Sequence, residues 1–166
     1  MAALAAPRLA FANAAQVPGA ARELSFLNLH TGEKLLAPYW EDGAYKKDAL
    51  SEIARVLRDH RSNEVHPIDV RLLDLVHQLT DTLDYQRPVH VISGYRSPAS
   101  NKMLRQRSGG VAKRSFHMSG KAIDLRLEGV PLRSVQKAAL AMKGGGVGYY
   151  GKSQFVHLDI GRVRRW

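Results

Sequence analysis

Cysteine is absent from this 166-residue sequence. A disulfide framework and a thiolate metal site are therefore excluded, so a metal ion would have to be held by histidine and carboxylate side chains. The sequence also lacks any apolar run long enough to cross a membrane as a helix, and it has no internal repeat. A chain of this length can bury its own core, and we expect one folded domain.

Acidic residues are scarce relative to basic ones. The chain carries 25 Lys and Arg against 15 Asp and Glu, which gives a formal net charge of +10. Such a surface favours polyanionic partners such as nucleic acids, anionic cell-wall polymers and membrane surfaces, although a soluble basic protein with no such partner has the same composition. Apart from Arg162, Arg164 and Arg165, the basic residues are spread out, and no stripe of interleaved basic and aromatic residues is present. We therefore expect no nucleic-acid partner.

The beginning of the chain differs in composition from the rest. It is rich in alanine and contains Ala12-Asn13-Ala14, a small-residue pattern typical of a signal-peptide cleavage site. The charged and apolar regions before this pattern are short for a complete signal. We interpret residues 1–22 as a leader or the remnant of a secretory signal, with a low-complexity disordered leader as the alternative. Residues 23–166 are the expected folded domain.

Helical and extended periodicities alternate along this domain. Apolar residues recur every two positions in several short segments, which predicts strands, and every three or four positions in others, which predicts helices. The predicted strands cover residues 24–29, 35–40, 89–93, 122–127, 147–150, 155–160 and a short segment within 162–166. The predicted helices cover residues 46–60, 67–83, 98–107 and 131–143. The pattern indicates an α+β fold with helices packed on one side of a small, mostly antiparallel sheet.

Two of the predicted strands carry polar side chains that can bind a metal ion. Because side chains alternate between the two faces of a strand, Asp124 and His157 each lie opposite the apolar residues of their own strand. If the two strands are neighbours, these two side chains can share one ion. His117 precedes Asp124 by seven residues, and Gly120 allows a tight turn that folds His117 back beside the carboxylate.

Two imidazoles and one carboxylate leave the fourth position of a tetrahedral zinc ion open, as catalytic zinc sites require. Zinc at such a site would lower the pKa of a water molecule to about 7 and polarise a scissile carbonyl group. The same side chains also bind other divalent ions, and an isolated histidine or aspartate on a strand is more often structural. The other five histidines have no spacing that predicts ligation, and we interpret them as surface or packing residues: His30, His60, His66, His77 and His90.

Three segments match the pattern of a known peptidase group. Residues 115–124 read Ser-Phe-His-Met-Ser-Gly-Lys-Ala-Ile-Asp, residues 93–97 read Ser-Gly-Tyr-Arg-Ser, and residues 145–157 begin with Gly-Gly-Val-Gly-Tyr-Tyr and end with Phe-Val-His. The chain thereby resembles the zinc D-Ala-D-Ala peptidases, which share their fold with the Hedgehog signalling domain. It is most similar to the MepK-like (YcbK-like) murein endopeptidases, and this resemblance extends to residues 28–33 and 57–59.

The resemblance implies a function and a set of ligands. It implies that residues 23–166 are a zinc peptidase domain in which His117, Asp124 and His157 hold a zinc ion. It also implies that the chain is secreted to the periplasm. It implies hydrolysis of the peptide cross-links of peptidoglycan during cell-wall growth or remodelling, including cross-links between two meso-diaminopimelate residues. The expected partner is the peptide stems of peptidoglycan, and we expect the protein to act as a monomer.

The resemblance also assigns catalytic roles. Arg96 matches a family arginine near the zinc ion, where a fixed guanidinium stabilises the oxyanion as it forms. The alternative is a turn arginine paired with a surface carboxylate. Better-known members place a glutamate, the general base, three residues before the last histidine ligand, but that position is Gln154 here. Asp159, two residues after His157, is the substitute candidate for the base. It is equally a candidate for holding an imidazole in its ligating tautomer.

Other functions stay open at this point. Because of Gln154, a zinc-dependent wall-binding module without catalysis is a rival, and a D,D-carboxypeptidase that trims terminal D-alanine would use the same ligands. A nucleic-acid binder driven by charge alone has no motif in its favour. Lys113, Arg114 and Lys121 surround the His117 loop and would attract the carboxylates of peptide stems.

Overall fold

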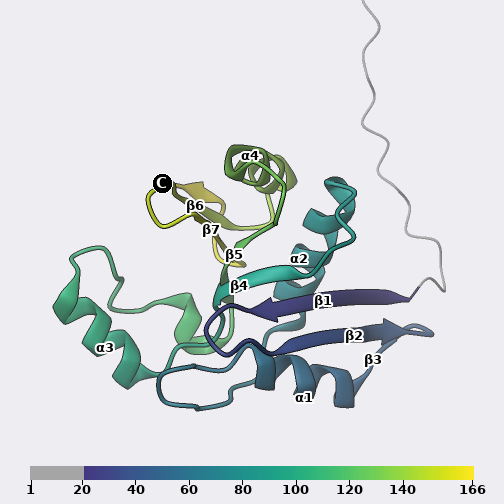
Figure 1. Ribbon diagram of the computed structural model, residues 1–166, viewed down its shortest axis with the longest axis horizontal. Helices are drawn as coiled ribbons and strands as arrows, with labels where there is room; N and C mark the ends of the chain where they lie inside the picture. Colours follow the sequence, from purple (N-terminus) through teal and green to yellow (C-terminus); the bar gives the residue numbers. More distant parts are fainter. Residues whose placement is uncertain (1–20) are drawn as a thin grey trace, which may run out of the picture.

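A mixed eight-stranded sheet forms the centre of the computed structural model, which describes residues 21–166 (Figure 1). The strands are β1 (Arg22–Asn28), β2 (Lys34–Glu41), β3 (Ala44–Tyr45), β4 (Val89–Ser93), β5 (Ala122–Arg126), β6 (Gly146–Tyr150), β7 (Phe155–Asp159) and β8 (Arg164–Arg165). Their order across the sheet is β3-β2-β1-β4-β5-β7-β6-β8. Only the pairs β1–β4 and β6–β8 of this sheet are parallel, so the predicted α+β fold with a mostly antiparallel sheet is confirmed.

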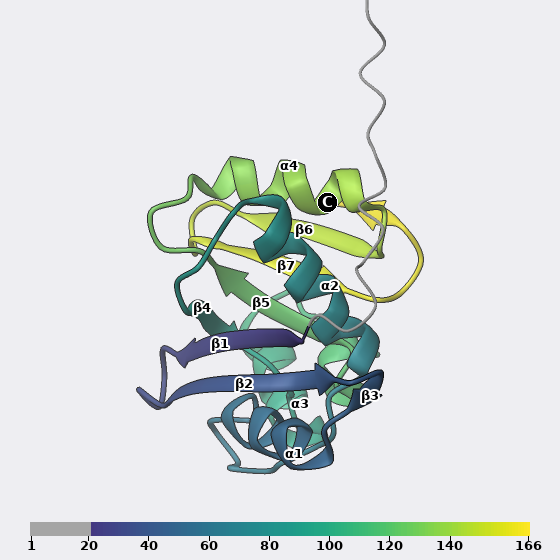
Figure 2. The same cartoon turned by 90° about the vertical axis from the view of Figure 1, so that its right-hand side faces the viewer.

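As predicted, most helices pack into the core on one side of the sheet, but α3 (Pro98–Arg107) lies on the other side (Figure 2). The others are α1 (Lys47–Val56), α2 (Val70–Thr82), α4 (Leu132–Met142) and a short 3-10 helix, η1 (Phe116–Ser119). Figure 2 shows α2 in front of the sheet and α3 behind it, and α1 packs against β2 while α4 packs against β6 and β7. Among these helices, none combines the length and the apolar character that crossing a membrane requires.

The element boundaries differ from the predicted ones mainly at two places. The helix predicted over residues 46–60 ends at Val56, because the backbone beyond it makes hydrogen bonds to other segments instead of continuing the helix. The two-residue strand β3 was not predicted, since two residues carry no periodicity. Of the predicted leader, residues 1–20 lie outside the described part of the chain, and Arg22 is the first residue of β1.

The predicted alternation of β5 and β7 is confirmed on the core side. The apolar residues of the two predicted strands are almost fully buried in the core that also contains residues of α2 and α4: Ile123, Leu125, Leu127, Val156 and Leu158. The opposite face is buried as well, with Asp124 at 6%, His157 at 9% and Asp159 at 0% exposure. Polar groups on this second face therefore sit in a protected environment, where charges interact more strongly than at an open surface.

A buried turn after β4 is held by the segment that follows α1. The backbone N–H of Tyr95 donates to the carbonyl oxygen of Leu57 over 2.7 Å, and the N–H of Ser97 donates to the carboxylate of Asp59 over 2.8 Å. Ser97 in turn caps α3 by accepting from Ser100. Gly94 lies so close to Leu57 that a Cβ atom there would overlap the Leu57 carbonyl and lie 2.8 Å from its Cβ. Only glycine therefore fits at this crossing.

Substitution of Gly94 tests this packing. Gly94→Ala should lower the free energy of unfolding by about 1–3 kcal/mol, because the added methyl group must displace a buried backbone segment. Gly109→Ala is the matched control, since a Cβ at Gly109 meets nothing within 4 Å and its φ is not positive. Denaturant unfolding measures both variants. Equal stability of the two would contradict the close approach.

Candidate metal centre

The three predicted ligands come from a short helix and two neighbouring strands. His117 lies in η1, which ends at Gly120 with a left-handed φ of 64°, and a Cβ there would collide with the carbonyl of Pro67. This tight turn returns the chain directly into β5, which carries Asp124. In the antiparallel ladder Asp124 is the cross-strand partner of His157 in β7. The predicted turn at Gly120 and the neighbouring strands are both confirmed.

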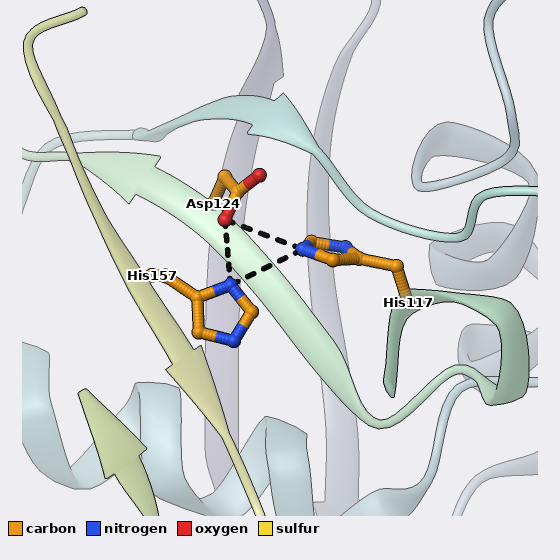
Figure 3. Close-up of side chains that lie close together, drawn as sticks. All are labelled: His117, Asp124 and His157. Atoms are coloured by element: carbon orange, nitrogen blue, oxygen red, sulfur yellow. Dashed lines mark hydrogen bonds and ion pairs between the residues drawn. The ribbon is translucent and has the colours of Figure 1, made fainter. Parts of the chain in front are cut away.

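The three side chains point toward one another (Figure 3). Nδ1 of His157 lies 2.8 Å from Oδ1 of Asp124, and Nε2 of His117 lies 3.3 Å from the same oxygen. The two imidazole nitrogens are 3.2 Å apart. Within residues 21–166, this is the one group of three or more histidine, cysteine or acidic side chains whose donor atoms lie close enough to hold a metal ion.

The hydrogen bonds on the outer side of each imidazole determine which ring nitrogen faces the centre with a free lone pair. Nδ1–H of His117 donates to the carbonyl oxygen of Gly94 over 2.7 Å, and Nε2–H of His157 donates to Oδ2 of Asp159 over 3.0 Å. We assign both protons from these partners. The inner nitrogens then present lone pairs to each other and to the Asp124 carboxylate. Three acceptors in contact repel one another unless a cation lies between them.

The electrostatics of the centre favour such a cation. Burial lowers the pKa of His157, but the carboxylates of Asp124 and Asp159 outweigh it and raise this pKa above its ordinary value. Burial raises the pKa of Asp124, but His117 and His157 bring it well below the usual range. The centre thus keeps its carboxylate ionised and attracts positive charge, in the form of a proton or of a metal ion that replaces it.

The donor set fits zinc. Ligands at about 2.0 Å in tetrahedral geometry lie about 3.3 Å apart, and the three observed separations run from 2.8 to 3.3 Å. Two imidazoles and one carboxylate are a donor set of catalytic zinc sites, which leave one position open. The three predicted ligands line a cavity of about 710 Å³, which would give a small molecule access to an open position.

Asp159 is held rigidly behind His157. Arg164 donates to both of its carboxylate oxygens, over 2.9 and 2.6 Å, and the backbone N–H groups of Gly146 and Gly161 add further hydrogen bonds. Burial raises the pKa of Asp159, but the hydrogen bonds from His157 and Arg164 bring it well below the usual range. Its contact to the centre is with the outer nitrogen of His157. This geometry favours the tautomer-setting role over the general base.

Arg96 lies on the other side of the shared carboxylate. One guanidinium nitrogen is 3.6 Å from Oδ2 of Asp124, and the side chain also contacts Ser93 and Asn101 at 3.4 and 3.5 Å. Arg96 is only 9% exposed, and its Nε has no hydrogen-bond partner within the described residues. Its carboxylate partner is thus a buried ligand residue and not a surface group.

Gln154 points away from the centre. It lies in the exposed turn between β6 and β7 with a φ of 56°, and its side-chain amide donates to the carbonyl of Gly151. Gln154 is not among the residues that line the cavity. The residue at the position of the usual glutamate therefore takes no part in the site.

Sequence reasoning did not identify several residues of the cavity wall. Arg164 lies in β8 and Trp166 directly follows that strand, and the Trp166 ring lies 5.3 Å from the ring of His157. Arg61 and His30 reach the cavity from loops far away in the sequence. Spacing carries no signal for such contacts, because each depends on how the sheet places its edge strands and loops. Of the basic residues around the His117 loop, Arg114 lines the cavity.

Known proteins share this sequence over nearly its whole length. A family model described as "Peptidoglycan L,D-endopeptidase MepK" matches residues 16–166. The Escherichia coli protein of that name is 45% identical over 145 residues, which cover 87% of this chain and 80% of the relative. A Haemophilus influenzae protein named "Probable peptidoglycan L,D-endopeptidase MepK" is 41% identical over 146 residues, covering 87% of this chain and 78% of the relative.

Metal-dependent stability tests the centre. After removal of metal with a chelator, zinc at 100 times its Kd should stabilise the wild-type fold by about 2.7 kcal/mol, because it binds the folded state. His117→Ala should abolish this increment, whatever its effect on the metal-free stability. His77→Gln is the control, since His77 pairs with Asp81 on α2. Thermal unfolding with and without zinc measures the increment, and an unchanged increment in His117→Ala would argue against the centre.

Proposed function

This chain belongs to the peptidoglycan L,D-endopeptidase MepK family, and we propose that it is a zinc-dependent murein endopeptidase whose metal ion is held by His117, Asp124 and His157. The observation that carries the proposal is the convergence of three lone-pair donors at the wall of a cavity large enough for a peptide. The substrate is the cross-linked peptide stems of peptidoglycan, and the reaction is hydrolysis of a cross-link during wall growth or remodelling.

The chain's own residues supply orientation and charge for this reaction. When bound, zinc supplies Lewis acidity and lowers the pKa of a water molecule to about 7. The Asp124 carboxylate and the two imidazoles hold their lone pairs in place before any metal binds. The buried guanidinium of Arg96 lies beside the same carboxylate, where it stabilises negative charge that develops on a substrate carbonyl oxygen.

Asp159 supports this arrangement from behind. By accepting the proton of His157 Nε2, it keeps Nδ1 free for the metal, and Arg164 keeps Asp159 in place. A partner of this kind contributes about 10–100-fold to metal affinity in other sites. We propose that Asp159 is a positioning residue for His157. The general base is then a group other than Asp159 or the exposed Gln154.

The cellular setting follows from the substrate. Peptidoglycan lies outside the inner membrane, so we propose a periplasmic protein, which agrees with the leader expected from the sequence. The net charge of +10 suits the carboxylates of peptide stems. One chain supplies all three proposed ligands, so a second copy is not needed to build the site, and we propose that a monomer is active.

Digestion of isolated sacculi tests the function. Metal-loaded wild-type protein should convert cross-linked muropeptides to monomers, and mass spectrometry of the products identifies the bond that is cut. His117→Ala and chelated wild type should lose about a thousandfold or more in rate, because the metal supplies several kcal/mol of stabilisation. Intact cross-links in the metal-loaded wild-type sample would point to a non-catalytic binding module, and release of terminal D-alanine to a carboxypeptidase.

Asp159→Asn in the same assay separates its two possible roles. If Asp159 is a positioning residue, the substitution should weaken zinc binding by about 10–100-fold. Excess zinc should then restore most of the cleavage. If Asp159 is the general base, cleavage by the variant should stay low even at saturating zinc. Persistent loss with a fully loaded metal site would overturn the positioning role.

A further inference from the structure

The cavity around the metal centre carries more positive than negative side chains. Four arginines and two aspartates line it: Arg61, Arg96, Arg114, Arg164, Asp124 and Asp159. The aspartates pair with Arg96 and Arg164, which leaves Arg61 and Arg114 without a side-chain hydrogen bond or ion pair within residues 21–166. A divalent ion would add to this excess. The cavity is therefore suited to a ligand that brings negative charge of its own.

Arg61 is the better fixed of the two unpaired arginines. Its backbone N–H donates to Oδ1 of the buried Asp59 over 2.9 Å, and the other oxygen of that carboxylate accepts from Ser97. One carboxylate therefore anchors both Arg61 and the turn that carries Arg96. Burial raises the pKa of Asp59, but hydrogen bonds from Ser100 and from the backbone bring it well below the usual range, so this anchor stays ionised.

The charges of Arg61 and Arg96 act on each other. Burial lowers the pKa of Arg96 from its ordinary value. The carboxylates of Asp124 and Asp59 oppose this effect, and the charge of Arg61 adds to it. Arg96 is nine-tenths buried and has an unpaired Nε. Its nearest carboxylate, Asp124, is already shared between two imidazoles. Both guanidiniums line the same cavity, and an incoming anion would offset the positive charge that Arg61 adds at Arg96.

A stacked pair of imidazoles flanks Arg61. His30, which lines the cavity, stacks on His60 with ring centroids 3.8 Å apart and planes 11° apart. Burial lowers the pKa of His60 to about 4, and the neighbouring Arg61 and His30 contribute. His60 is therefore neutral near pH 7 and adds no charge beside Arg61.

We propose that Arg61 is a substrate-recognition residue, which binds a free carboxylate of the peptide next to the scissile bond, with Arg96 contributing its charge. The inference rests on the proposed endopeptidase function. A carboxylate on the carbon that bears the scissile amide nitrogen lies within a few bonds of the carbonyl to be attacked. A peptide placed with that carbonyl at the metal centre, beside Arg96, carries such a carboxylate within the cavity that Arg61 also lines. An amidated carboxylate brings no charge and should be discriminated against.

Paired synthetic substrates test this inference. We would compare a cross-linked stem peptide that carries the free carboxylate with the same peptide amidated at that carboxyl group, and measure kcat and KM separately. For the wild type, kcat/KM should be about tenfold or more higher for the free carboxylate. Arg61→Gln should raise KM for this peptide by about tenfold at little-changed kcat, and should leave the amidated peptide unaffected.

Two further variants make the test decisive. Arg55→Gln removes the same charge from an exposed position on α1 outside the cavity and should behave as the wild type. Arg61→Lys keeps the positive charge but loses the planar guanidinium that can bind a carboxylate through two hydrogen bonds. It should retain part of the preference for the free carboxylate. Equal use of the two peptides by the wild type, or an undiminished preference in Arg61→Gln, would overturn the inference.

Failure of the proposed function has a different signature. If metal-loaded wild type cleaves neither peptide, the endopeptidase proposal fails. The affinities of both peptides for wild type and Arg61→Gln, measured by calorimetry, then decide on the carboxylate subsite by themselves. A preference for the free carboxylate that disappears in Arg61→Gln supports the subsite, and equal affinities reject it.

Discussion

A buried carboxylate shared by two imidazoles is the interaction on which the site depends. Asp124 lies within 2.8 and 3.3 Å of the inner nitrogens of His157 and His117. Taking three polar groups out of water is unfavourable unless each is paired, and here the inner lone pairs face one another. A cation at the centre, either a proton or a metal ion, relieves the repulsion between these lone pairs.

The surrounding structure keeps these lone pairs in place. The segment after α1 fixes the turn at Gly94, whose carbonyl accepts the outer proton of His117. On the opposite side, Arg164 fixes Asp159, which accepts the outer proton of His157. Both imidazoles are thus oriented by groups from distant parts of the sequence. The same helix-end segment anchors Arg61 through Asp59, so the proposed metal centre and the proposed recognition residue share one support.

Periodicity predicted the parts of this design that are local. The alternation in β5 and β7 placed Asp124 and His157 on one face, and Gly120 indicated the turn that brings His117 back. The resemblance to known peptidases predicted that these three residues bind the metal ion. Contacts between distant segments could not be predicted from the sequence. The end of α1 at Val56 and the ion pair between Arg164 and Asp159 both depend on which segments meet in the folded protein. For that reason the two roles open to Asp159 could be weighed only with the structure.

Anomalous X-ray scattering at the zinc edge is the most direct test of the central claim. In crystals of metal-loaded protein, we expect one strong peak about 2.0 Å from Nε2 of His117, a carboxylate oxygen of Asp124 and Nδ1 of His157. Absence of a peak between these three side chains, or a zinc ion bound by other residues, would contradict the account.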